Sequence, residues 1–216
     1  MKFVNGEYYH IFNRGTDKRI IFSEQSDLDR FFQGMIEFNT VEPIGSIYEN
    51  SFRKKELGNR ISKYYKQQKK LVNFICYCLN PNHYHFILEQ LNDKGIEKFM
   101  QRLGIGYTKY FNQKYERNGV LFQGAFKSIH INSNEYMLHL SAYVNLNNKV
   151  HKFEQLGNRI SKSSWDEYMQ NADIDNFCEK SIILNQFSSA SEYKTFAEDS
   201  LKSIKERKDM EKLLLE

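Results

Sequence analysis

One near-continuous apolar run constrains the fold of this chain more than any other feature. Residues 71–79 read LVNFICYCL, and such a run is typical of a buried strand. The turn signal Asn80-Pro81-Asn82 follows it, and residues 83–89 (HYHFILE) have the composition of a second strand. The sequence therefore predicts a hairpin-like pair of strands at the centre of the fold.

The segments on either side of this pair complete an ordered set of elements. Aromatic and β-branched residues predict further strands, and apolar residues at helical spacing predict amphipathic helices. The resulting order of strand, helix, strand, strand, helix, strand is the split βαβ, or ferredoxin-like, arrangement of the α+β class. The expected flanking elements are a strand at 8–13, a helix at 27–38, a helix at 95–117, a strand at 125–131 and a last core helix running to about 147.

The length of 216 residues suits one compact domain with an appendage. We expect residues 1–150 to form the core domain, with a polar and basic connection or insertion at about 41–70. Residues 151–216 are expected to form a helical C-terminal extension, with helices at 173–184 and 191–216. Asn132 and Glu135 have the spacing of a capping box, which predicts where the last core helix begins.

Several classes of protein are disfavoured by composition. No stretch of about 18 apolar residues is present, so we expect no membrane-spanning helix, and the first residues lack the core of a signal peptide. The odd count of three cysteines fits a reducing cytoplasm better than a disulfide framework. Cys76 and Cys78 would share one face of a strand, where two small core residues are favoured over metal ligands. We therefore expect a cytoplasmic protein.

The positive charge of the chain is modest overall but unevenly distributed. The net charge of +4 alone is a weak indication of a polyanionic partner. Between residues 53 and 70, however, eight basic residues accompany a single acid, Glu56, and two tyrosines, Tyr64 and Tyr65. Basic groups neutralise phosphates and aromatic rings can stack on unpaired bases, although a solvated loop would have the same composition.

Two short patterns could hold catalytic chemistry. His83 and His85 are two apart in an expected strand, so both imidazoles would project on one face and could bind one metal ion. Tyr143 and Asn147 are four apart in an expected helix and would supply a nucleophile and an oxygen ligand on one face. Taken singly, each pattern is explained at least as well by ordinary packing of histidine or tyrosine against the sheet.

Longer motifs give these residues a family context. The chain resembles REP-associated tyrosine transposases, within the HUH single-tyrosine (insertion-sequence-200-like) transposase family. The resemblance extends over about residues 7–170, and each motif falls on the expected element in the expected order. The matching segments are 9–15 (YHIFNRG) with Ile21-Phe22, 79–85 (LNPNHYH), 119–128 (GVLFQGAFKS), 143–147 (YVNLN) and Ser163-Ser164-Trp165 with Tyr168.

The resemblance implies a fold, a metal and a substrate. It implies a ferredoxin-like fold, a bound Mg²⁺ or Mn²⁺ ion, and single-stranded DNA folded into hairpins. On the matching positions, His83 and His85 would be metal ligands, Asn147 the third ligand, and Tyr143 the nucleophile that forms a 5′-phosphotyrosine intermediate. Family members often have proline directly after the position of Asn147, where this chain has Asn148.

Basic residues along the chain complete the expected site. We expect the protein to work as a monomer or a homodimer and to be associated with the nucleoid when bound to DNA. His10 and His130 are candidates for the base that accepts the phenol proton, although a structural role is favoured for each. The expected DNA contacts are Arg14, Lys18, Arg19, Arg53, Lys54, Lys55, Arg117 and Lys127.

Two other functions fit the same sequence. One is a non-catalytic or host-recruited nucleic-acid-binding module of ferredoxin-like fold, since aromatic strands and basic loops would serve it equally well. The other is a metal-dependent hydrolase in which water, and not Tyr143, attacks the phosphate. A stable covalent DNA adduct would exclude the second function and any module without catalysis.

Overall fold

A single antiparallel sheet organises the chain. The computed structural model describes residues 2–57, 68–150, 160–169 and 176–213. Within these ranges, five strands pair in the order β4-β1-β3-β2-β5, and every neighbouring pair is antiparallel. The order of the first four strands is that of the ferredoxin-like fold, which confirms the expected fold class. The strands are β1 (Tyr8–Arg14), β2 (Val72–Asn80), β3 (His83–Gln90), β4 (Lys127–His130) and β5 (Lys162–Ser163).

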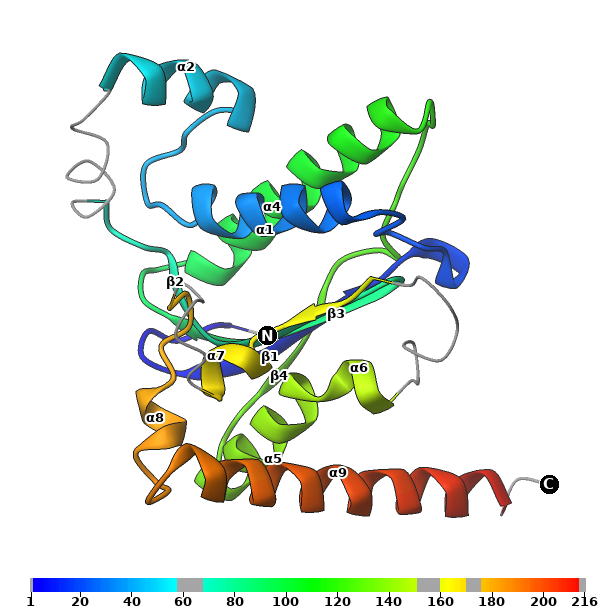
Figure 1. Cartoon of the computed structure of the whole chain (residues 1–216). Helices are drawn as coiled ribbons and strands as arrows, with labels where there is room; N and C mark the ends of the chain where they lie inside the picture. The colour runs from blue at the N-terminus through cyan, green and yellow to red at the C-terminus, as the bar shows by residue number, and fades with distance from the viewer. Residues whose placement is uncertain (1, 58–67, 151–159, 170–175, 214–216) are drawn as a thin grey trace.

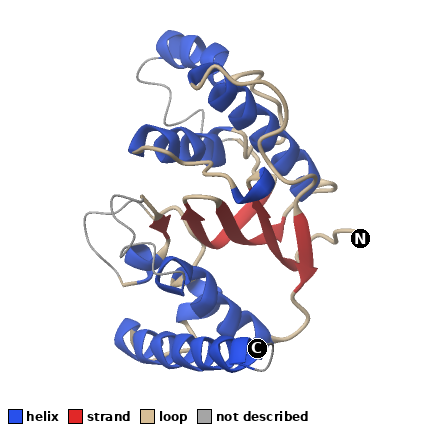
Figure 2. Cartoon of the chain, turned by 90° about the vertical axis from the view of Figure 1, so that its right-hand side faces the viewer, coloured by secondary structure: helices blue, strands red, loops and turns tan. Residues whose placement is uncertain are grey.

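Helices cover both faces of this sheet (Figures 1 and 2). The crossover helices α1 (Gln25–Glu37) and α4 (Gly95–Lys114) lie on one face, with α2 (Ile47–Leu57) beyond them. The helices α5 (Asn134–Asn145), α6 (Asn147–Val150) and α9 (Ala190–Leu213) lie on the other face. The short elements are η1 (Thr16–Lys18), α7 (Trp165–Tyr168) and α8 (Ser181–Leu184).

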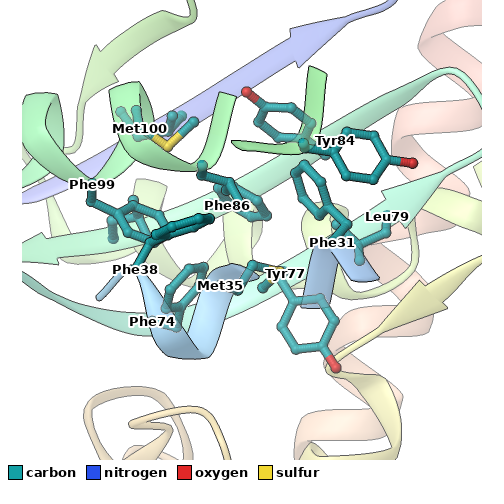
Figure 3. Packing of buried hydrophobic residues seen from close by; sticks show 14 of the residues in the cluster. Phe31, Met35, Phe38, Phe74, Tyr77, Leu79, Tyr84, Phe86, Phe99 and Met100 are labelled. Carbon is teal, nitrogen blue, oxygen red and sulfur yellow. The ribbon is translucent and has the colours of Figure 1, made fainter. Parts of the chain in front are cut away.

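The face beneath α1 and α4 is an aromatic core (Figure 3). Alternation along β3 directs Tyr84, Phe86 and Leu88 to this side, where all three are buried. Phe86 packs edge-on against Phe74 of β2, with ring centroids 5.3 Å apart. Each fully buried side chain of this size contributes about 1.5–3 kcal/mol through removal of apolar surface from water. This side therefore supplies much of the stability of the fold.

The opposite face is smaller, and buried hydrogen bonds cross it. Tyr193 of α9 is fully buried, and its hydroxyl lies 3.0 Å from Ser141 Oγ and accepts a 3.0 Å hydrogen bond from Asn145 Nδ2. Asn145 Oδ1 in turn accepts from Ser164 Oγ at 2.6 Å. The segment after residue 150 therefore shares a core with the helix that holds Tyr143, while the division into a domain and an extension at residue 150 stays a prediction.

Several local expectations differ from the structure. The connection at 41–70 contains a helix, α2, and residues 58–67 lie outside the described ranges. Ser133, not Asn132, caps α5 by accepting a hydrogen bond from Tyr136 N, because Ser133 is the residue with extended backbone before the first turn. The helix expected at 173–184 is described only as α8, and residues 173–175 lie outside the described ranges.

The last core helix is also interrupted. It ends at Asn145, and Leu146 caps it before α6 begins at Asn147. Tyr143 and Asn147 are thus four residues apart across a break, not within one continuous helix. No helix in the described part of the chain has the length and apolar character needed to cross a membrane.

Candidate active site

The turn between β2 and β3 anchors the candidate site. The connection after β1 packs on this turn: Gly15 N donates to Asn82 O at 2.9 Å, and Ile21 N donates to Pro81 O at 2.7 Å. A Cβ atom on Gly15 would lie 2.3 Å from Arg19 O, so the close approach requires glycine. These contacts hold the basic end of β1 beside the first histidine of β3.

His83 and His85 project from β3 on the side of α5, as their spacing predicts. Their ring centroids are 5.2 Å apart and their planes are nearly perpendicular, at 86°. His83 Nδ1 lies 2.7 Å from Asn82 Oδ1, and the Nδ2 group of Asn82 donates to Lys18 O. Asn82 Oδ1 can only accept at Nδ1, whereas the Nδ2 group of Asn80 can donate to Nε2 at 3.0 Å, so this arrangement favours a neutral His83 with its hydrogen on Nδ1 and a lone pair on Nε2.

The lone pair on His83 Nε2 faces another hydrogen-bond acceptor. His83 Nε2 lies 3.0 Å from Oδ1 of Asn147, a fully buried residue. The Nδ2 group of Asn80 lies 2.7 Å from Asn147 Oδ1 and 3.0 Å from His83 Nε2, and so offsets the repulsion between the two acceptors. A half-buried and a buried acceptor that converge in this way fit a cation as their common partner.

The donor set also fits the expected class of ion. Octahedral Mg²⁺ binds oxygen at about 2.0–2.1 Å, so two adjacent ligands are roughly 3 Å apart. The separation of 3.0 Å between His83 Nε2 and Asn147 Oδ1 matches that edge. Amide oxygen is a ligand of the type that Mg²⁺ and Mn²⁺ prefer, and imidazole nitrogen is a ligand for first-row divalent metals. Among the described residues, no three His, Cys, Asp or Glu side chains gather as a metal site, so a metal ion bound here would need the amide oxygen as a ligand.

Tyr143 lies directly beside these groups. Its ring centroid is 5.5 Å from that of His85, with an interplanar angle of 79°, and its side chain is half-buried. Burial raises the pKa of Tyr143 above its ordinary value, and the adjacent Asn147 amide acts in the opposite direction. The phenol therefore needs a base or a nearby positive charge before it can act as a nucleophile near neutral pH.

His10 also belongs to this group of side chains, and its partner could not be identified from the sequence. Its Nε2 lies 2.9 Å from His85 Nδ1, and the residue is buried. Burial lowers the pKa of His10 to about 4, so His10 is neutral at pH 7. The other candidate base, His130, instead pairs with Glu7 Oε2 at 2.9 Å on an exposed part of β4.

A positively charged cavity opens next to the two histidines. Its volume is about 510 Å³, and three of the expected DNA contacts (Arg14, Lys18 and Lys127) line it. No acidic residue in the described part of the chain lines it, so it suits an anionic ligand such as a phosphate backbone. The remaining lining residues are Phe12, Asn13, Asn82, His83, His85 and Gln123.

The other expected DNA contacts do not line this cavity. Arg53, Lys54 and Lys55 belong to α2, beyond α1 and α4 on the opposite side of the sheet, where Lys54 pairs with Glu37 at 2.6 Å (Figure 1). Arg19 and Arg117 donate within the chain, to Thr16 O and Asn112 Oδ1 respectively. Their contact with DNA stays a prediction.

Comparisons with known proteins find a family model that covers much of this site. Residues 45–147, which include both histidines, Tyr143 and Asn147, match the family model described as "Transposase IS200 like". A solved structure, described as a "REP associates tyrosine transposase bound to a REP hairpin", matches with a TM-score of 0.49 and 9% identity. That match covers 81% of this chain and 86% of the other.

No protein with a curated description matches the chain. The family match rests on a segment that contains β2, β3, α4, β4 and α5, and that brings together the paired imidazoles, the amide and the phenol. Residues 45–147 of this chain are therefore similar to the IS200-like transposase family.

Proposed function

We propose that this protein is a metal-dependent nickase and strand transferase for single-stranded DNA, with Tyr143 as the nucleophile. The observation that supports this proposal most strongly is the grouping of phenol, imidazole and amide. Tyr143 lies against His85, His83 lies against Asn147, and the cation-lined cavity opens beside both histidines. This grouping joins a nucleophile, a metal-binding donor set and an anion-binding surface.

The reaction requires one new bond and one broken bond. Tyr143 Oη would attack the phosphorus of the scissile phosphate, and the bond from phosphorus to the 3′ oxygen would break. The 3′ oxygen leaves as a hydroxyl after taking up a proton, and the 5′ end stays attached to the phenol oxygen. The reverse attack by a 3′-hydroxyl on the phosphotyrosine rejoins DNA and frees the tyrosine, which makes strand transfer possible.

Other residues of this chain would hold the metal ion and position the nucleophile. His83, His85 and Asn147 would hold a divalent ion, Mg²⁺ or Mn²⁺. When bound, that ion supplies positive charge that polarises the scissile phosphate and favours the phenolate form of tyrosine. Asn80 holds the side chains of His83 and Asn147 at their close separation through its two contacts. The half-buried position of Tyr143 limits the freedom of the nucleophile.

The substrate is proposed to be DNA with an unpaired segment next to a hairpin. Arg14, Lys18 and Lys127 would neutralise phosphates of the unpaired strand in the cavity. Phe12 is half-buried, lines the same cavity and lies 5.6 Å from the ring of His85, which suits stacking on an unpaired base. We propose that the protein acts in the cytoplasm, on the nucleoid when bound to DNA, as a monomer or a homodimer.

Covalent trapping tests the proposal directly. The protein is incubated with Mn²⁺ and single-stranded hairpin DNA from the flanks of its own gene, and the products are separated on a denaturing gel. We expect a protein–DNA adduct that disappears with Tyr143→Phe, with His83→Ala and with a chelator. Tyr136→Phe, on the same helix and also half-buried, is the matched control and should keep the adduct.

Other outcomes would favour the other functions. Cleavage without any adduct would indicate a hydrolase in which water attacks. The protein could instead bind the DNA tightly but give neither cleavage nor adduct with Mg²⁺ or with Mn²⁺. That outcome would indicate a nucleic-acid-binding module. Persistence of the adduct in Tyr143→Phe would show that another tyrosine is the nucleophile.

A further inference from the structure

A buried contact between two histidines crosses from β1 to β3 at the candidate metal site. His10 Nε2 lies 2.9 Å from His85 Nδ1, and the ring planes differ by only 20°. Strand pairing places Phe12, not His10, directly opposite His85, so the contact is diagonal across the two strands. His10 and His85 are 6% and 9% exposed, so water has little access to the contact.

Two tautomers are compatible with this distance, and they differ in their consequence for metal binding. If His10 donates from Nε2, the Nδ1 of His85 accepts, and neutral His85 has a hydrogen on Nε2 and no lone pair there. If His85 donates from Nδ1, the lone pair of His85 is on Nε2. Only the second arrangement lets His85 bind a metal through Nε2, the nitrogen that is not occupied by His10.

We propose that His10 is a positioning residue that accepts a hydrogen bond from His85 Nδ1 and thereby presents His85 Nε2 to the divalent ion. This inference rests on the proposed function, since it assumes that His85 is a metal ligand. Partners of this kind fix both the tautomer and the orientation of a metal-binding histidine. Because His10 is an imidazole, it does so without placing a negative charge beside the phosphate of the substrate.

The surroundings of His10 support a positioning role. Phe12 lies 4.8 Å from the His10 ring and 5.6 Å from the His85 ring, both in stacked geometry, so it restricts the rotation of both imidazoles. His83 is oriented in the same manner by another group, since its Nδ1 lies 2.7 Å from Asn82 Oδ1, which can only accept. Each expected histidine ligand thus has a partner at Nδ1, which leaves Nε2 as the binding atom in both.

The first test uses the metal-free protein. Long-range nitrogen–proton NMR of the imidazole rings, assigned with His10→Gln and His85→Ala, reports which ring nitrogen bears the hydrogen. We expect the hydrogen of His85 on Nδ1 in the natural protein. A hydrogen on Nε2 of His85 would overturn the inference. The measurement needs neither metal nor DNA.

The second test measures Mn²⁺ affinity by calorimetry on four variants. His10→Phe keeps a flat ring but removes the acceptor, and loss of such a partner weakens metal binding by about 10–100-fold. His10→Gln retains an acceptor and should bind Mn²⁺ within a few-fold of the natural protein. His130→Phe is the matched control, on the neighbouring strand and paired with Glu7, and should be unchanged. His85→Ala should lose the site.

The outcomes separate this inference from the proposed function. If His85→Ala loses Mn²⁺ binding but His10→Phe binds as tightly as the natural protein, His10 is not a positioning residue and the metal site stands. If the natural protein and His85→Ala bind Mn²⁺ equally, the metal site itself fails and the inference fails with it. Thermal unfolding shows whether each variant is folded, and if His10→Phe is not, the ring NMR of the natural protein decides.

Discussion

The two faces of the sheet use alternate residues of the same strands but differ in chemistry. On β3, Tyr84, Phe86 and Leu88 enter the aromatic core under α1 and α4, while His85 and Ile87 face α5. The aromatic face is held by stacked and edge-on rings. The α5 face buries polar groups that need hydrogen-bond partners, such as Asn145, Asn147 and Tyr193.

The difference shows how one small fold can separate stability from chemistry. Buried polar groups weaken a core unless each finds a partner, so a site made of them needs support from elsewhere. Here the aromatic face supplies that support across a single layer of strands. Substitutions on the two faces should therefore change different observables, with catalysis and metal binding affected on one face and stability on the other.

The largest effect is expected on the site face. His85→Ala removes a proposed metal ligand and should lower DNA cleavage by at least about 10²–10³-fold, the loss typical when a group that stabilises the transition-state charge is removed. Its free energy of unfolding should change little compared with that of Phe86→Ala. Single-turnover cleavage and urea unfolding measure the two effects. A cleavage rate close to that of the natural protein would contradict the assignment of His85.

The next largest effect is expected on the neighbouring residue of the other face. Phe86 is fully buried, so Phe86→Ala leaves a cavity and should reduce the free energy of unfolding by about 3–5 kcal/mol. Chemical denaturation measures this loss. At temperatures where the variant stays folded, Mn²⁺ affinity should be close to that of the natural protein. A loss well below 1 kcal/mol would mean that the aromatic face is not the main source of stability.

A third prediction concerns an ion pair at the edge of the aromatic face. Lys114 Nζ lies 2.6 Å from Asp27 Oδ1, and Tyr115 Oη donates to Asp27 Oδ2 at 2.7 Å. Burial alone would raise the pKa of Asp27, but these hydrogen bonds outweigh burial and hold the pKa below its ordinary value. Lys114→Met should lower the free energy of unfolding by about 1–3 kcal/mol at pH 7.

The pH dependence of this loss has a definite sign. Because the folded-state pKa of Asp27 is depressed, its contribution is present above the unfolded pKa and is lost as the pH falls through the folded value. The difference between Lys114→Met and the natural protein should therefore shrink as the pH falls below about 4. Lys109→Met, at an exposed position of the same helix, is the control. A difference that stayed constant from pH 7 to pH 2 would contradict the role given to Asp27.

The smallest effect is expected when a single cationic side chain is removed from the DNA-binding surface. Lys18→Gln, in the cavity beside His83, should weaken single-stranded DNA binding and reduce the slope of log affinity against log salt by roughly 0.7 for one lost phosphate contact. Lys55→Gln, on α2 across the sheet, should change the DNA affinity and the salt-dependence slope less. Fluorescence anisotropy at several salt concentrations compares them. A larger effect of Lys55 would show that α2 is the main DNA-binding surface.

Much of the sheet and part of the candidate site could be predicted from the sequence. The apolar run at 71–79 and the alternation of residues 83–89 predict the central strands because strand periodicity is local, and the order of elements then predicts the sheet. The pairing of His83 with His85 on one face follows from the same alternation. The cavity cations Arg14, Lys18 and Lys127 were expected near DNA, although nothing in their spacing brings them together.

The parts that could not be predicted depend on contacts between distant segments. The 2.9 Å contact between His10 and His85 arises from a diagonal register across β1 and β3, and no local pattern encodes that register. The break at Leu146 lies within a sequence that continues the helical pattern. The packing of Tyr193 against α5 joins residues about fifty positions apart. The sequence around α2 suggested a basic connection, because its helix has little amphipathic character.

The most direct test of the account is the identity of the residue that becomes attached to DNA. Intact-protein mass spectrometry after incubation with Mn²⁺ and a hairpin oligonucleotide, followed by peptide mapping, locates the adduct. We predict a single covalent adduct on Tyr143 that is absent from Tyr143→Phe and retained in Tyr136→Phe. An adduct on another residue, or cleavage of the oligonucleotide that continues unchanged in Tyr143→Phe, would contradict the central claim.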